Sequence, residues 1–141
     1  MLRKPWFLLA LVFTIVFSGC KKPPSNREVH PVKGMVMLDG EPVRLAVIYL
    51  EPKDPAIGNE AKGYVREDGS FAIRTYSNTD DDGAVPGEYK VSIVPYSNTL
   101  YGPKPEGVEP TPIPEKYRNA RTSDLVVEIK PGDNKLNLRL K

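Results

Sequence analysis

Proline and glycine divide this chain into short pieces. The 141 residues include 15 Pro and 11 Gly, most of them beyond residue 20. Proline removes a backbone N–H donor and breaks helices, while glycine allows the positive φ angles of tight turns. Beyond residue 20, no long stretch is therefore left free for a helix. The pattern predicts short strands joined by turns.

Apolar and polar side chains also alternate from residue 32 onward. An alternation of period two places the apolar side chains of a strand on one face of a sheet. Turn residues interrupt the alternation at intervals of roughly 8–12 residues, which is the rhythm of a β-sandwich or barrel. The segments with this pattern are 32–38, 43–50, 61–66, 70–76, 88–95, 125–130 and 136–140.

These segments predict an all-β domain, a single antiparallel β-sandwich of about seven strands. The strand at 43–50 is expected to be central or covered, because it is apolar on both faces. Asp68-Gly69 is the clearest hairpin turn. The segment 97–114 holds five prolines and little apolar content, so we expect a long loop there.

The first twenty residues have the features of a secretory signal. Arg3 and Lys4 are followed by an almost unbroken apolar run over 6–17. At about a dozen residues this run is too short for a stable membrane span, which needs ~20 residues. A basic start, a short apolar run and small residues after it are typical of a signal peptide. An uncleaved membrane helix is the alternative.

Phe17, Ser18, Gly19 and Cys20 resemble the lipobox of bacterial lipoproteins. The resemblance implies cleavage before Cys20 and a diacylglycerol on its thiol. Ser18 and Gly19 match the motif, whereas Phe17 stands where the family usually has an aliphatic residue. Cys20 is the only cysteine of the chain. A stable anchor requires more than one acyl chain, because a single chain binds a membrane only marginally.

This interpretation divides the chain into three parts. Residues 1–19 are the signal peptide, residues 20–31 the lipidated cysteine with a flexible tether, and residues 32–141 the folded domain. The tether is expected because its residues are polar, charged or proline, with little to bury.

The domain resembles the carboxypeptidase regulatory-like domains, which have a transthyretin-like, Ig-like fold. The resemblance rests on the order of several short motifs along the chain. They are 32–36 (VKGMV), 39–43 (DGEPV), 46–50 (AVIYL), 67–71 (EDGSF), 85–91 (VPGEYKV), 113–117 (IPEKY), 122–125 (TSDL) and 130–134 (KPGDN). The resemblance implies an antiparallel β-sandwich that serves as an accessory module, without catalytic residues.

Composition also argues against an enzyme. His30 is the only histidine, and it lies in the expected tether. A Ser-His-Asp or Cys-His arrangement needs a base held in the folded domain, and a zinc hydrolase usually needs several histidines. We therefore expect no catalytic residues and no cofactor. A net charge of +2 is too small to favour nucleic acid as a partner.

Two groups of polar residues are weaker candidates for a site. Asp80 and Asp82 could begin a calcium site, because calcium prefers carboxylate and carbonyl oxygens. A solvated polar loop is the more common meaning of such a run. Four tyrosines in or beside loops could stack on sugars or contact a protein, or could simply cover sheet edges. They are Tyr76, Tyr96, Tyr101 and Tyr117.

Together these features predict a non-catalytic protein held in the cell membrane or outer membrane by acylated Cys20. Its domain would face the periplasm or the extracellular space. We expect a structural or binding module that contacts another envelope protein or a polysaccharide. The alternative is a carrier of a small ligand, bound between the sheets or under the 97–114 loop.

Overall fold

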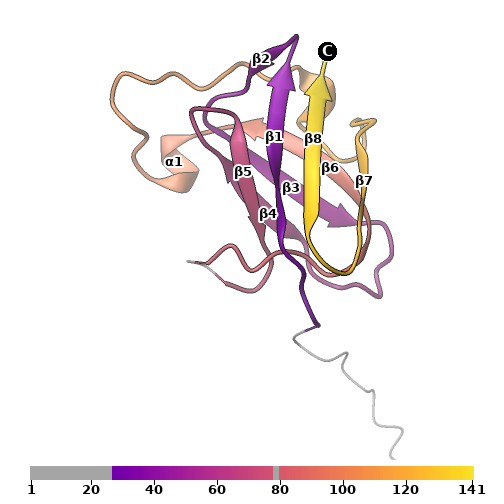
Figure 1. Ribbon diagram of the computed structural model, residues 1–141. Helices are drawn as coiled ribbons and strands as arrows, with labels where there is room; N and C mark the ends of the chain where they lie inside the picture. The colour runs from indigo at the N-terminus through magenta and orange to yellow at the C-terminus, as the bar shows by residue number, and fades with distance from the viewer. Residues whose placement is uncertain (1–26, 78–79) are drawn as a thin grey trace, which may run out of the picture.

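The computed structural model describes residues 27–77 and 80–141 (Figure 1). Cys20 and the predicted signal peptide lie outside this part of the chain. The strands are β1 (Val32–Leu38), β2 (Glu41–Pro42), β3 (Ala46–Pro52), β4 (Ala61–Val65), β5 (Ser70–Arg74), β6 (Gly87–Pro95), β7 (Val126–Ile129) and β8 (Asn134–Leu140). A one-turn helix, α1 (Asn98–Tyr101), and a 3₁₀ turn at Glu115–Tyr117 lie between β6 and β7. The predicted all-β class is confirmed.

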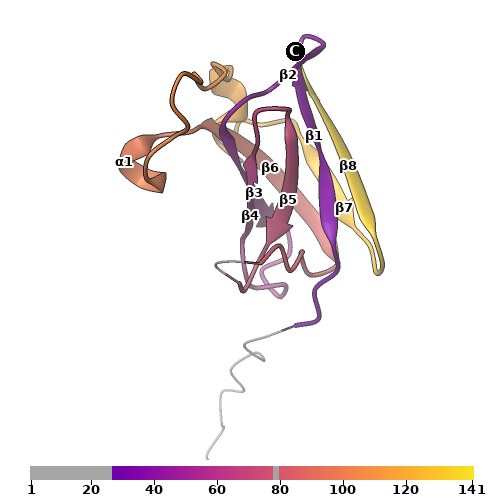
Figure 2. The same cartoon turned by 60° about the vertical axis from the view of Figure 1, so that its left-hand side comes forward.

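The strands form one sheet that curls into a half-barrel (Figure 2). Its order is β2-β1-β5-β4-β3-β6-β7, with β8 on the other edge of β1. The sequence predicted a sandwich of two sheets. The difference arises at β5, because residues 70–72 pair with β1 while Ile73 and Arg74 pair with β4. This strand therefore joins the two halves that a sandwich would keep separate.

The prediction of a purely antiparallel arrangement is wrong at one pair of strands. β1 and β8 are parallel, with Val32 opposite Asn134 and Leu38 opposite Leu140. Parallel neighbours require a long connection, and here the chain from β2 to β7 supplies it. The alternation of apolar residues is the same for both directions of pairing, so sequence periodicity could not show this.

The core lies inside the curl. In the longer strands, alternate residues point inward, and most of these are almost fully buried. The largest of them are Phe71, Tyr89, Ile48, Leu50, Ile73, Ile93, Ile129, Val32 and Val36. β3 lies between β4 and β6, as expected for a strand that is apolar on both faces. It begins at Ala46 rather than at residue 43, because Leu45 has a φ of 48° that interrupts the extended backbone.

Residues assigned to the tether contact the domain. The backbone of His30 exchanges two hydrogen bonds with Ala84, at 2.9 and 3.0 Å. Gly83 permits this approach, because a Cβ at that position would lie 2.0 Å from the His30 carbonyl oxygen. Val29 is half-buried against the core. In the described part of the chain, no helix is both long and apolar enough to span a bilayer.

Shortening Ile48 should destabilise the domain strongly. Its side chain is fully buried in the core, so Ile48→Ala should cost about 2–5 kcal/mol of unfolding free energy through lost burial and a residual cavity. Val126 is 46% exposed, and Val126→Ala is the matched control, with an expected effect within about 0.5 kcal/mol. Urea denaturation measures both. Equal effects would contradict the assignment of Ile48 to the core.

Candidate functional site

The proline-rich segment folds back over the outer face of β3 and β4. Tyr101, at the end of α1, shares a short hydrogen bond with the hydroxyl of Tyr49 on β3. Its ring also packs edge-on against Tyr64 of β4, with 5.9 Å between the ring centroids. Val47 points to the same outer face as Tyr49 and is fully buried. The segment is therefore a loop that covers the sheet, with a single helical turn.

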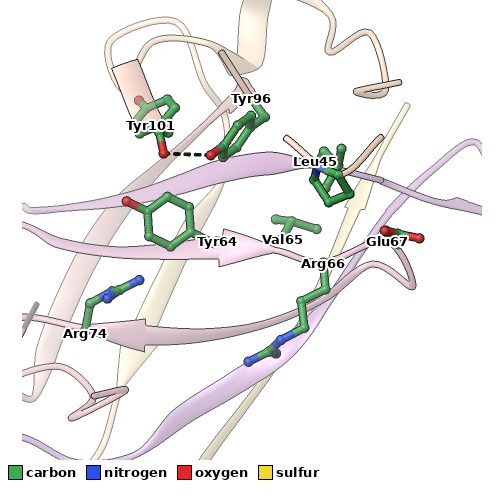
Figure 3. A pocket seen from close by; sticks show the side chains of 9 residues that line it. Leu45, Tyr64, Val65, Arg66, Glu67, Arg74, Tyr96 and Tyr101 are labelled. Atoms are coloured by element: carbon green, nitrogen blue, oxygen red, sulfur yellow. Dashed lines mark hydrogen bonds between the residues drawn. The ribbon is translucent and has the colours of Figure 1, made fainter. Parts of the chain in front are cut away.

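A groove of about 520 Å³ lies between this loop and the outer face of the sheet (Figure 3). It combines three tyrosine rings with charged and apolar side chains. Its lining residues are Leu45, Tyr64, Val65, Arg66, Glu67, Arg74, Tyr96, Tyr101 and Pro105. The volume lies within the range of about 300–1,000 Å³ that is typical of small-molecule sites.

The alternation of β4 explains which side chains reach the groove. Ala61, Gly63 and Val65 are buried, so Lys62 and Tyr64 point outward. Gly63 allows β5 to approach closely, since a Cβ there would lie 2.5 Å from the Ala72 carbonyl oxygen.

Arg74 joins the groove from the neighbouring strand. It pairs with Lys62 across the sheet and therefore lies on the same outer face. Its guanidinium lies over the Tyr64 ring, 4.7 Å from the centroid. This cation–π contact orients both side chains.

Tyr96 fixes the loop that forms the other wall. Its backbone N–H donates to the Leu45 carbonyl at 2.9 Å. Its hydroxyl donates to the Tyr101 carbonyl at 2.7 Å, as Figure 3 shows, and reaches the Gly102 carbonyl at 3.2 Å. The rings of Tyr96 and Tyr101 lie 5.4 Å apart at 45°. The position of this wall is therefore set by both backbone and side-chain hydrogen bonds.

The groove has a polar rim and a half-buried aromatic interior. Burial, followed by the hydrogen bond to Tyr101, raises the pKa of Tyr49 above its ordinary value. Arg66 and Glu67 are exposed at the rim, and Arg66 lies 3.8 Å from the carboxylate of Asp81. Such an exposed pair contributes little to stability, which leaves Arg66 able to engage a ligand.

The acidic run is part of a hydrogen-bonded loop. The Asp82 carboxylate accepts hydrogen bonds from the backbone N–H groups of Thr75, Tyr76 and Ser77, at 2.7 to 3.0 Å. Asp80 is bonded to Ser77. Within residues 27–77 and 80–141, no group of three or more His, Cys, Asp and Glu side chains is arranged to hold a metal ion. The hydrogen bonds of the Asp82 carboxylate hold the backbone of Thr75 to Ser77.

The structure separates the four tyrosines that the sequence singled out. Tyr96 and Tyr101 line the groove. Tyr117 is buried in the core, and its hydroxyl accepts a hydrogen bond from the Lys141 backbone N–H at 3.1 Å. Tyr76 lies outside the groove, where its hydroxyl accepts a bond from the Arg27 N–H.

The sequence did not single out Tyr64, Arg66 or Arg74. The period-two pattern of β4 and β5 was the available signal, because it places Tyr64 and Arg74 on the outer face. It did not show that a distant loop covers that face.

The fold should lose stability as the pH rises above about 10. The unfolded chain releases the Tyr49 proton near the ordinary pKa of 10.0, whereas the folded chain retains it to higher pH. This stabilisation is thus fully present below pH 10 and is lost above it. Burial also raises the pKa of Tyr89, to about 12. Tyr49→Phe should therefore make the alkaline decline shallower without abolishing it.

Denaturant titrations of wild type and Tyr49→Phe at pH values from about 8 to 12 measure this decline. If the unfolding free energy falls equally steeply with pH in the two proteins, Tyr49 titrates alike in the folded and unfolded chains and the prediction is wrong.

Comparisons with known proteins give limited matches. No family model matches this chain, and no curated protein matches it. Similar solved structures include a DUF3823 family protein from Parabacteroides merdae ATCC 43184, with 16% identity and a TM-score of 0.48 over 81% of this chain. A DUF3823 family protein from Bacteroides ovatus ATCC 8483 has 17% identity and a TM-score of 0.41 over 78%. The matches cover 46% and 44% of those two chains, so this chain spans less than half of their length.

Proposed function

We propose that this protein is a non-catalytic, lipid-anchored envelope module that binds a polysaccharide in the groove between the 97–114 loop and the sheet. The observation that carries the proposal is the grouping of Tyr64, Tyr96 and Tyr101 beside Arg66 and Arg74. Aromatic faces pack against the C–H faces of sugar rings, and charged side chains at the rim bond to hydroxyl or carboxylate groups. A groove that is open at its rim also accommodates a chain.

The lining of the groove supports binding rather than hydrolysis. Glycoside hydrolysis ordinarily needs two carboxylic acids on opposite sides of the scissile bond. Glu67 is the only carboxylic acid among the residues that line the groove, and it is exposed. His30, the only histidine of the chain, does not line the groove. Its Nδ1 atom accepts a hydrogen bond from the Gly132 N–H at 3.0 Å.

A small-ligand carrier is the second candidate, and one observation favours it. The groove lies under part of the 97–114 loop, where a small molecule would lie against the packed rings of Tyr64 and Tyr101. The two functions differ in how affinity depends on ligand length. A polysaccharide site gains affinity as sugar units are added until the groove is filled, whereas a carrier binds the single unit as tightly as the chain.

The lipid anchor and the domain type belong to the same proposal. Support for the anchor is the single cysteine after Ser18 and Gly19, at the end of a short apolar run. Support for a carboxypeptidase regulatory-like domain is the order of its sequence motifs, which fall in strands β1, β3 and β6 and in the Asp68-Gly69 hairpin. The anchor would place the groove outside the cytoplasm, where envelope polysaccharides are found.

Truncating a groove tyrosine should weaken sugar binding. Isothermal titration calorimetry with oligosaccharides of increasing length, uncharged and uronic-acid-containing, measures the effect. Removal of an aromatic anchor costs about 1 kcal/mol or more, so Tyr64→Ala should bind about fivefold or more weakly. Tyr76→Ala is the matched control, because Tyr76 is also half-buried but lies outside the groove. Equal affinity of Tyr64→Ala and wild type would contradict the proposed site.

The lipid anchor is tested by mass spectrometry of the protein extracted from membranes. We expect the chain to begin at Cys20 and to carry the added mass of two or three acyl chains. Cys20→Ser should block this processing or release the domain from the membrane. An intact Met1 to Gly19 segment, or a free thiol at Cys20, would rule out the anchor while leaving the groove proposal unaffected.

A further inference from the structure

Three cations lie together on the outer face of β1 and β8. The parallel register places Lys33 beside Lys135 and Met37 beside Arg139. Because neighbouring residues of paired strands share a face, these side chains line one surface together with Met35 and Asn137. We call this surface the β1–β8 face. The two strands contain no Asp or Glu, so every charged side chain that they contribute to the face is cationic. Asp133 and Asp39 lie in the turns at its two ends.

The fold does not neutralise these charges. Lys33, Lys135 and Arg139 are exposed, and none of them belongs to an ion pair within the described residues. Strands in a sheet are only about 4.8 Å apart, so Lys33 and Lys135 repel each other, and like charges directly opposite are destabilising. An anionic surface outside the protein would attract both side chains and so offset this repulsion.

The face also carries an exposed apolar side chain. Met35 is 39% exposed and is one of three large apolar residues with high exposure in the described chain. It lies between Lys33 and Met37 on the same side of β1. A cationic surface with a central thioether is suited to the interface of a bilayer, where charges meet head groups and apolar side chains enter the acyl boundary.

The position of the face in the chain identifies its partner. β1 begins only twelve residues after Cys20, a distance of at most about 40 Å when fully extended. The strand itself is about 23 Å long. If Cys20 is in the membrane, the β1–β8 face is therefore within reach of the lipid surface along its whole length.

We infer that the β1–β8 face rests on anionic lipid head groups and orients the domain on the membrane. This inference depends on the proposed lipid anchor to bring the domain to the bilayer. Figure 2 shows α1 on the opposite side of the domain from β1 and β8. With the face on the membrane, the groove beside α1 points away from the lipid, where a polysaccharide can enter it.

A fluorophore at two exposed positions tests the orientation. Met35→Cys and Leu100→Cys each provide one free thiol in the mature protein, because Cys20 carries lipid. Leu100 is 73% exposed on α1, so it is the matched position on the far side. Each labelled protein is reconstituted into vesicles whose head groups carry a quencher. One set contains phosphatidylglycerol, and the other only phosphatidylcholine.

We expect stronger quenching at Met35 than at Leu100 in the phosphatidylglycerol vesicles. The difference should be lost in phosphatidylcholine, and also at about 1 M salt, where the Debye length is about 3 Å. The triple variant Lys33→Gln, Lys135→Gln and Arg139→Gln, called the face variant below, should abolish the difference as well. The control triple variant is Lys53→Gln, Lys116→Gln and Arg121→Gln, which removes three exposed cations outside the face and should preserve the difference.

Equal quenching at the two positions, or a difference that survives the face variant, would overturn the inference. Failure of the anchor has a separate signature, since the protein would not sediment with phosphatidylcholine vesicles. Sedimentation with phosphatidylglycerol vesicles then tests the face directly. Each basic residue near an anionic surface contributes about 1 kcal/mol, so the face variant should bind roughly a hundredfold more weakly. Absence of binding to either kind of vesicle would overturn both the lipid anchor and the contact of the β1–β8 face with the membrane.

Discussion

The structure depends on the burial of β3 on both of its faces. On one face Ile48 and Leu50 enter the core, and on the other Val47 is fully buried and Tyr49 is hydrogen-bonded to Tyr101 of the loop. Pairing with β4 and β6 on its two edges leaves the strand no contact with solvent along most of its length. Because the loop packs on Tyr49 and Tyr64 of the outer face, the groove beside it is a consequence of how that face is covered.

The loop also explains why the groove has a defined shape despite its proline content. The Tyr96 hydroxyl donates a hydrogen bond to the Tyr101 backbone carbonyl within the loop, and the Tyr101 hydroxyl is hydrogen-bonded to Tyr49 on the sheet. These contacts hold aromatic rings against a rim of arginine side chains. The curled sheet places the cationic strands β1 and β8 on another side of the domain from α1, so the proposed membrane contact and the proposed ligand contact lie on different sides (Figure 2).

Sequence periodicity predicted most of the strands, because alternation and Gly-containing turns are local signals. Asp68-Gly69 joins β4 and β5 as expected, and β3 is covered on both faces along most of its length. Periodicity did not predict the parallel pairing of β1 with β8 or the continuity of the sheet through β5, since both depend on contacts between distant segments. A pocket under the 97–114 loop was one of the alternatives, but the sheet residues that line it were not predicted, for the same reason. Tyr96 and Tyr101 were candidates, but Tyr64 and Arg74 become part of a site only when the loop folds over them.

The central claim is that a sugar chain binds between this loop and the sheet. A titration of the ¹⁵N-labelled protein with an oligosaccharide, followed by amide chemical shifts, tests it most directly. The account predicts shifts concentrated at the end of β4 and in the turn after it, from Tyr64 to Glu67, and in the loop from Tyr96 to Pro105, with little change at Lys33 or Lys135. Shifts confined to the β1–β8 face, or no shifts with any oligosaccharide, would contradict it.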